Sequence, residues 1–237
     1  MWTAIVEKRK DVEAERILAL DISTKTGYCN LISSDIGMKL MDYGTLPQIH
    51  EPEGSYPSNY VIWAYDNFKG IKELIDKFKP EILIVEETSK GSKNGKSQKI
   101  LEFTHFLLGQ FIKDSGIKSV YLQTEEWRRE IGCKMSDTEK LKNKAVRDYK
   151  KKFEKENSKK TTVAYDTNGK RIGLTGKKHV NVRRANEIFG DQLKESLILA
   201  NEDLADALGL AACYHFRRLK VDNTEEVTME DIIKDKI

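Results

Sequence analysis

The sequence ILALD at residues 17–21 is a short apolar run that ends in an acid, Asp21. A run of this length and composition predicts a buried β-strand. A second run, ILIV at residues 82–85, ends in the same way at Glu86. An unpaired buried carboxylate is costly. Two buried strands that both end in an acid therefore indicate a place where something compensates the charge.

The third acidic segment has helical spacing. Asp203 and Asp206 lie three residues apart in an amphipathic stretch, so a helix from about residue 202 to 216 places both on one face. Ala205 and Ala207 are small enough to let this helix pack closely on a sheet. Each acid alone has an ordinary explanation, such as a helix-dipole interaction for Asp203. It is much harder to explain all four acids in this way at once.

Converging carboxylates with no histidine or cysteine among them favour a hard divalent cation. We expect Mg²⁺, with Mn²⁺ as a substitute, and two ions about 4 Å apart, an arrangement typical of phosphodiester hydrolysis. In this interpretation Asp21 bridges the two ions. The predicted catalytic and metal-ligating residues are Asp21, Glu86, Asp203 and Asp206. The histidines His105, His179 and His215 are predicted to pack or to contact DNA rather than to catalyse.

The predicted order of elements is β-β-β-α-β-α-β, followed by basic elements and a closing helix. We expect a helix over residues 61–78 that stops at Pro80, a helix N-capped by Thr124, and a hairpin over residues 161–175. Three antiparallel strands followed by βαβ units predict an α/β fold: a mixed five-stranded sheet with helices on both faces. This order puts Asp21 in the middle of the sheet.

Charge divides the 237 residues unevenly, although the net charge is only +3. Residues 134–184 hold 17 Lys and Arg against 6 Asp and Glu, and residues 219–237 hold 3 against 6. A basic block of this kind is typical of a polyanion-binding protein, although a solvated insertion would also account for it. We predict an N-terminal extension over residues 1–15, a domain over 16–217 with a basic insertion at about 138–178, and an acidic tail over 218–237.

The cysteines favour a reducing compartment, and the hydropathy pattern favours a protein that stays inside the cell. The three cysteines are far apart, which indicates neither a disulfide framework nor a zinc site. No apolar run reaches the length of a membrane span, and the N-terminus lacks the pattern of a signal peptide. We therefore expect a cytoplasmic protein.

Basic residues near the acids are candidates for phosphate contacts. The predicted DNA-binding residues are Lys90, Lys93, Lys96, Lys99, Lys134, Lys144, Arg147, Lys178, Arg183 and Arg184. Aromatic wedges at Tyr121, Trp127 or Phe106 could stabilise opened DNA, with core packing as the alternative. The helix from residue 98 could supply a dimer face or ordinary core.

These motifs resemble those of the RuvC-type Holliday-junction resolvases of the ribonuclease H-like superfamily. The resemblance covers about residues 16–216, and its phage branch is the more similar. It rests on LALD at 18–21 with Gly27 and Tyr28, IVEE at 84–87, and DLADAL at 203–208. Further motifs are EET at 86–88 with SQKILEFTH at 97–105, WR at 127–128 with IGCKMS at 131–136, and VRRANE at 182–187.

The resemblance implies a homodimeric crossover junction endodeoxyribonuclease of a bacterial or virus-infected cell. It implies two Mg²⁺ ions on the four acids and symmetric paired nicks in a four-way DNA junction. One alternative is an actin-like or sugar-kinase-like ATPase, which also begins with a strand ending in Asp. Others are a ribonuclease H-like nuclease acting on other branched or hybrid substrates, and a non-catalytic DNA-binding module.

Overall fold

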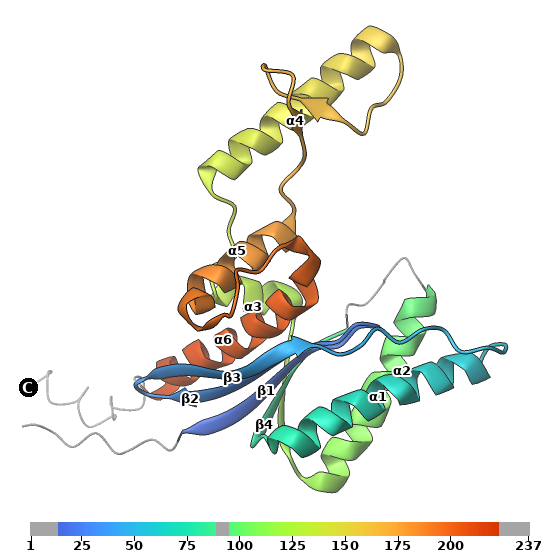
Figure 1. The fold of residues 1–237 in the computed structure, drawn as a ribbon, viewed down its shortest axis with the longest axis vertical. Helices are drawn as coiled ribbons and strands as arrows, with labels where there is room; N and C mark the ends of the chain where they lie inside the picture. Colours follow the sequence, from blue (N-terminus) through green and yellow to red (C-terminus); the bar gives the residue numbers. More distant parts are fainter. Residues whose placement is uncertain (1–13, 89–94, 223–237) are drawn as a thin grey trace, which may run out of the picture. The chain divides into compact units, whose positions relative to one another are not determined.

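The computed structural model describes residues 14–88 and 95–222 (Figure 1). The chain divides into two compact units, one taken from residues 1–131 and 203–237 and the other from residues 132–202. The first unit contains all four acids singled out in the sequence. None of the helices within the described ranges is long and apolar enough to cross a bilayer.

The sheet of the first unit is mixed, as predicted. Its order is β3-β2-β1-β4-β5, with β1 in the centre. The antiparallel part is β1 (Glu15–Asp21), β2 (Gly27–Ser34) and β3 (Gly37–Thr45). The parallel part adds β4 (Ile82–Glu86) beside β1 and β5 (Lys118–Leu122) beside β4. The prediction of a five-stranded mixed α/β sheet is confirmed.

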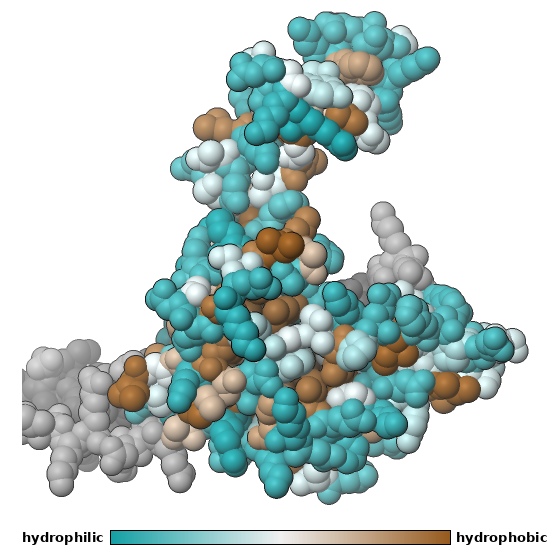
Figure 2. Space-filling model, viewed as in Figure 1, coloured by the Kyte–Doolittle hydropathy of each residue, from teal (hydrophilic) through white to brown (hydrophobic). Residues whose placement is uncertain are grey.

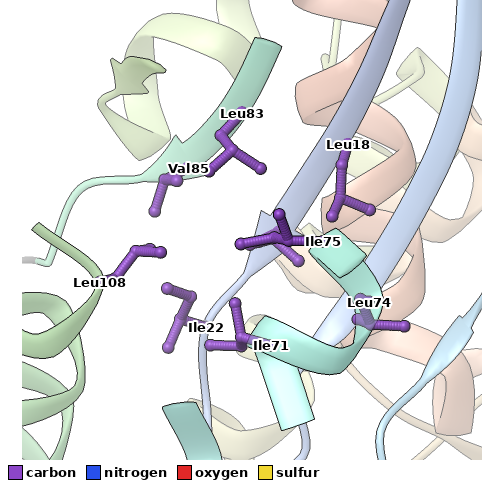
Figure 3. Close-up of a cluster of buried hydrophobic side chains, with 9 residues drawn as sticks. Leu18, Ile22, Ile71, Leu74, Ile75, Leu83, Val85 and Leu108 are labelled. Atoms are coloured by element: carbon purple, nitrogen blue, oxygen red, sulfur yellow. The ribbon is translucent and has the colours of Figure 1, made fainter. Parts of the chain in front are cut away.

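The two faces of the sheet carry alternate residues of each strand, since successive residues of a strand point to opposite faces. Leu18 and Leu20 of β1 join an apolar cluster with α1 (Ser58–Phe78) and α2 (Gly95–Ser115), part of which Figure 3 shows. Leu83 and Val85 of β4 belong to the same cluster. The alternate positions of these strands, including Asp21 and Glu86 at their ends, therefore face the other side.

Helix α6 (Glu202–Asp222) covers that other side (Figure 1). Ser33 of β2 forms a 2.8 Å hydrogen bond with the Nδ1 atom of His215. The hydroxyl of Tyr214 donates to Glu15 of β1 at 3.0 Å. His215 is buried, which agrees with packing, one of the two roles predicted for it.

The first turn of α6 approaches β2 very closely at Gly27. A Cβ atom built on Gly27 would lie 2.1 Å from the backbone carbonyl oxygen of Asp203, which is far inside van der Waals contact. Gly27 pairs with Asp21 across the β1–β2 ladder. The missing side chain at Gly27 therefore lets the first turn of α6 lie beside the end of β1.

Helix ends follow the sequence with some differences. Helix α1 ends at Phe78, just before Pro80 as predicted, and Lys79 between them takes the left-handed conformation. Helix α3 (Thr124–Glu130) already includes Thr124, and Gln123 holds the N-cap position without a side-chain bond. The prediction of Thr124 as N-cap was wrong by one residue. Helix α6 continues to Asp222, beyond the predicted end at residue 216.

The second unit is built on the long polar helix α4 (Asp137–Asn157), which starts with a capping box between Ser136 and Glu139. Asn143 of α4 is buried, and its side-chain amide donates to the backbone carbonyl of Thr175 at 2.9 Å and accepts from the backbone N–H of Thr175 at 2.7 Å. These bonds fasten the chain that follows the hairpin to the helix.

The predicted hairpin is present but short. Its strands are β6 (Ala164–Tyr165) and β7 (Arg171–Ile172), and Asp166 accepts hydrogen bonds from the backbone of Asn168 and Lys170 in the turn. The remaining elements of this unit are α5 (Lys177–Phe189) and the 3₁₀ helices η1 (Gly190–Gln192) and η2 (Leu199–Asn201).

Replacing Gly27 tests the close approach of α6. We expect Gly27→Ala to lower the free energy of unfolding by about 1–3 kcal/mol, because the added methyl group overlaps backbone that has little freedom to move. Urea denaturation measures the change. Gly109→Ala in α2 is the matched control, since its Cβ meets nothing within 4 Å, and it should be neutral or stabilising. Equal stability of Gly27→Ala and wild type would contradict the packing described.

Candidate metal centre

Three carboxylates from three elements meet at one end of the sheet. Leu20 of β1 pairs with Val85 of the parallel strand β4, so the next residues, Asp21 and Glu86, end neighbouring strands at the same edge. Asp206 comes from the second turn of α6. One carboxylate oxygen from each of Asp21, Glu86 and Asp206 lies within 4.8 Å of the others. The sequence predicted all three acids for one site, and the structure brings them together.

The fourth predicted acid, Asp203, is not part of that set of three. It lies one turn earlier on α6, where its backbone carbonyl packs over Gly27. Its charge still contributes to raising the pKa of Asp21. Asp203 therefore borders the cluster, and its role as a ligand stays a prediction.

The cluster is electrostatically unfavourable without a cation. Asp21 is only 8% exposed, and this burial is the main reason why its pKa lies well above the usual value. The charges of Glu86 and Asp206, a hydrogen bond with Glu86 and the charge of Asp203 raise this pKa further. A divalent cation would remove both the repulsion and the desolvation cost. With only carboxylates as converging ligands, these residues fit Mg²⁺ or Mn²⁺.

Two neighbouring residues of α3 hold the acids from the side. The indole Nε1 of Trp127 donates to Oε1 of Glu86 at 3.0 Å, and Nη2 of Arg128 donates to Oδ2 of Asp206 at 3.1 Å. Trp127 is fully buried, so of the two alternatives left open for this residue core packing holds and an exposed aromatic wedge does not. The WR motif was noted in the sequence, but no local signal says which acids its side chains meet.

The predicted DNA-binding lysines of the first unit lie near aromatic rings where the structure describes them. Lys96 forms an ion pair with Glu51 and lies 5.5 Å from the ring centre of Trp63. Lys99 is exposed and lies 4.4 Å from the ring centre of Tyr56. Lys90 and Lys93 lie outside the described residues.

The predicted basic residues of the second unit differ in their surroundings. Arg183 is held by Glu139, by Glu187 and by the backbone carbonyl of Lys134, so it has a structural role within this unit. Arg184 pairs with Glu187, and Lys178 pairs with Glu202. Lys134, Lys144 and Arg147 have exposed side chains. DNA contact by these residues stays a prediction.

The raised pKa of Asp21 predicts a dependence of stability on pH in EDTA. The folded state holds this proton more tightly than the unfolded chain does, so the stability that Asp21 contributes is full below its usual pKa of 3.8. This contribution falls as the pH rises toward the raised pKa. Asp21→Asn has no such proton, so it should be more stable than wild type at neutral pH in EDTA.

Urea denaturation of both proteins between pH 4 and pH 8 measures this difference. Asp76→Asn on α1 is a control, because Asp76 is exposed and paired with Lys72 away from the site. It should keep the wild-type pH profile. A loss of stability with rising pH that is the same in Asp21→Asn and in wild type would show that the pH dependence does not originate at Asp21.

The fold is shared with solved structures. RuvC of Thermus thermophilus in complex with Holliday junction substrate matches 86% of this chain and 94% of its own, with 13% sequence identity and a TM-score of 0.52. A second structure of Thermus thermophilus RuvC matches 87% and 97%, with 15% identity and a TM-score of 0.52. The yeast mitochondrial Holliday junction resolvase Ydc2 matches 87% and 82%, with 14% identity and a TM-score of 0.46.

No protein-family model matches the chain, and no curated protein sequence matches it either. At identities this low, the structural likeness establishes the fold. The chain therefore has the ribonuclease H-like fold of RuvC, as its sequence motifs indicated.

Proposed function

We propose that this protein is a Mg²⁺-dependent DNA endonuclease that cuts four-way junctions by phosphodiester hydrolysis. The observation that carries the proposal is the convergence of Asp21, Glu86 and Asp206 at one edge of the sheet. This convergence occurs in the fold of RuvC, which has been solved with Holliday junction substrate.

Asp21, Glu86, Asp203 and Asp206 would together hold two ions. When bound, Mg²⁺ or Mn²⁺ lowers the pKa of water and supplies positive charge for the departing oxygen of the phosphodiester. The chain's own contribution is the placement of the carboxylates at the ends of β1 and β4 and on α6. No histidine is required as a nucleophile in such a site.

The second unit supports a DNA-binding role through the charge on α4. Four of its lysines and its arginine recur at spacings of three and four, which places these five along one side of the helix over about 22 Å. All five side chains are exposed. The part of the molecule that α4 occupies in Figure 1 is largely hydrophilic on the face that Figure 2 shows. This basic stripe consists of Lys140, Lys144, Arg147, Lys151 and Lys155. We infer that it binds phosphates of a duplex arm.

Together with the basic stripe, the other predicted residues would complete the DNA contacts: Lys90, Lys93, Lys96, Lys99, Lys134, Lys178, Arg183 and Arg184. We further infer a homodimer, because paired nicks on opposite strands need two active sites. The exposed Phe106 of α2, 63% accessible, is a candidate contact between the two copies. The free, buried thiols of Cys29 and Cys213 support a reducing compartment, and we infer the cytoplasm of a bacterial or virus-infected cell.

The ATPase alternative is less well supported. Such enzymes need two lobes, each with its own sheet, to enclose a nucleotide. Across residues 14–88 and 95–222 the structure has one five-stranded sheet and one two-stranded hairpin. This arrangement favours the nuclease.

Cleavage of a fixed, end-labelled four-way junction in Mg²⁺ tests the proposed function. We expect paired nicks on opposite strands, with a matched linear duplex left intact. Asp21→Asn should bind the junction as tightly as wild type does and produce no detectable product, because the central ligand of the site is lost. Asp76→Asn should cut at the wild-type rate. Nicking by Asp21→Asn would refute the metal site, and equal cutting of the linear duplex would refute junction selectivity.

The basic stripe predicts a salt effect on binding. We expect the double variant Lys144→Ala/Arg147→Ala to bind a junction more weakly and to reduce the slope of log K against log [salt] by about 2, because two phosphate contacts are lost. Lys142→Ala is the control, since Lys142 lies on the opposite side of α4 and is also exposed. An unchanged slope in the double variant would exclude the stripe from the interface.

A further inference from the structure

Trp127 is positioned so that its only polar atom meets the acidic cluster. Its ring is fully buried, and a buried indole N–H needs an acceptor. That acceptor is Oε1 of Glu86 at 3.0 Å. The bond satisfies the indole and also fixes the orientation of the carboxylate at the end of β4.

Helix α6 fixes the indole in turn. A Cβ atom added to Gly209 of α6 would lie 2.6 Å from Cζ3 of Trp127 and 3.2 Å from Cδ1 of Ile131. Gly209 therefore leaves the space that the ring occupies, and the ring has little room to change its rotamer. The helix that carries Asp206 thus also holds the residue that orients Glu86.

Arg128 does for Asp206 what Trp127 does for Glu86. Its Nη2 donates to Oδ2 of Asp206 at 3.1 Å, and its guanidinium lies 5.0 Å from the centre of the Trp127 ring. The side chains of Arg128 and Asp206 are only 18% and 12% exposed. Because the pair is shielded from water, its hydrogen bond is both stronger and more restrictive than one on the surface.

Burying the guanidinium of Arg128 costs stability, and good packing alone does not explain why the protein accepts this cost. Its Nε atom is buried without a hydrogen-bond partner in the structure. An unsatisfied buried donor is destabilising, so a residue selected for stability alone would be expected to satisfy or avoid it. What Arg128 does provide is one positive charge beside a group of acids that repel one another.

We propose that Trp127 and Arg128 are positioning residues that hold Glu86 and Asp206 in the orientation needed to bind a divalent cation. The inference rests on the metal site of the proposed function and deepens it. Ligands held by hydrogen bonds from their surroundings are pre-oriented, and loss of such bonds typically weakens metal affinity by about 10–100-fold. Trp127 acts on the β4 ligand and Arg128 acts on the α6 ligand, so α3 aligns two of the three elements of the site.

Isothermal titration of the DNA-free protein with Mn²⁺ tests this role without relying on cleavage. Trp127→Phe keeps a ring but loses the N–H, and Arg128→Met keeps much of the length but loses the charge and its donors. We expect each variant to bind Mn²⁺ about 10–100-fold more weakly than wild type. Arg128→Lys retains the charge without the planar fork and should recover part of the affinity.

Two control variants remove equivalent interactions elsewhere. Trp63→Phe deletes an indole hydrogen bond of 3.1 Å to the backbone of Ile49. Arg217→Met deletes a 2.6 Å ion pair with Glu126 that also joins α6 to α3. Both controls should bind Mn²⁺ as wild type does, even where urea denaturation shows a loss of stability.

Wild-type Mn²⁺ affinity in folded Trp127→Phe and Arg128→Met would overturn the positioning role and leave the metal site intact. If Arg128→Met does not fold, Arg128→Lys decides the question for Arg128, since full wild-type affinity there would show that its geometry is irrelevant. Asp21→Asn separates the two proposals. Mn²⁺ binding that is equally tight in Asp21→Asn and in wild type would refute the metal site itself, and the positioning role with it.

Discussion

The contact between the first turn of α6 and Gly27 of β2 is the constraint on which the site depends. A strand end and a helix start meet there at a distance that no side chain on residue 27 would permit. This contact brings the acids of α6 to the end of the central strand. Without it, Asp21 and Glu86 would still be neighbours on adjacent strands, but Asp206 would not complete the group.

The close packing has an electrostatic consequence. Burial and neighbouring carboxylates raise the pKa of Asp21, so the protein spends stability to hold these acids together. Such a cost is common at functional sites, where a ligand compensates for it. The polar groups of α3 limit the disorder that repulsion would otherwise cause, since Trp127 and Arg128 each hold one carboxylate. The fold thus supplies both the convergence of the acids and the means to restrain them.

The second unit has a different physical character. Its helix α4 buries few side chains, among them Asn143 and Val146, and leaves most of its basic residues exposed. Polar contacts also hold its elements together, among them the two bonds between Asn143 and Thr175 and the ion pairs of Arg183. A unit of this kind suits a charged surface for a polyanion better than a catalytic pocket. Counting charges could not distinguish Arg183, which forms ion pairs inside this unit, from Lys144, whose side chain is exposed.

Local sequence was sufficient to predict where the strands lie and which acids, with the exception of Asp203, meet in one cluster. The apolar runs before Asp21 and Glu86, the spacing of Asp203 and Asp206, and the stop at Pro80 all express short-range rules of burial, periodicity and backbone geometry. The sheet order followed from these elements, because short links force antiparallel strands and a helical crossover forces parallel ones.

Only the tertiary structure decided which side chains touch. It separated Asp203 from the three acids that share one cluster, and it placed Trp127 in the core, where the sequence had left a wedge and core packing both open. It also showed that Gly27 and Gly209 serve as points of close approach between elements distant in the chain. Such contacts depend on how a helix surface fits a sheet and another helix, and neither periodicity nor composition carries that information. The sequence by itself determined where carboxylates end strands and line a helix, while packing between the elements decided which carboxylates could share one cation.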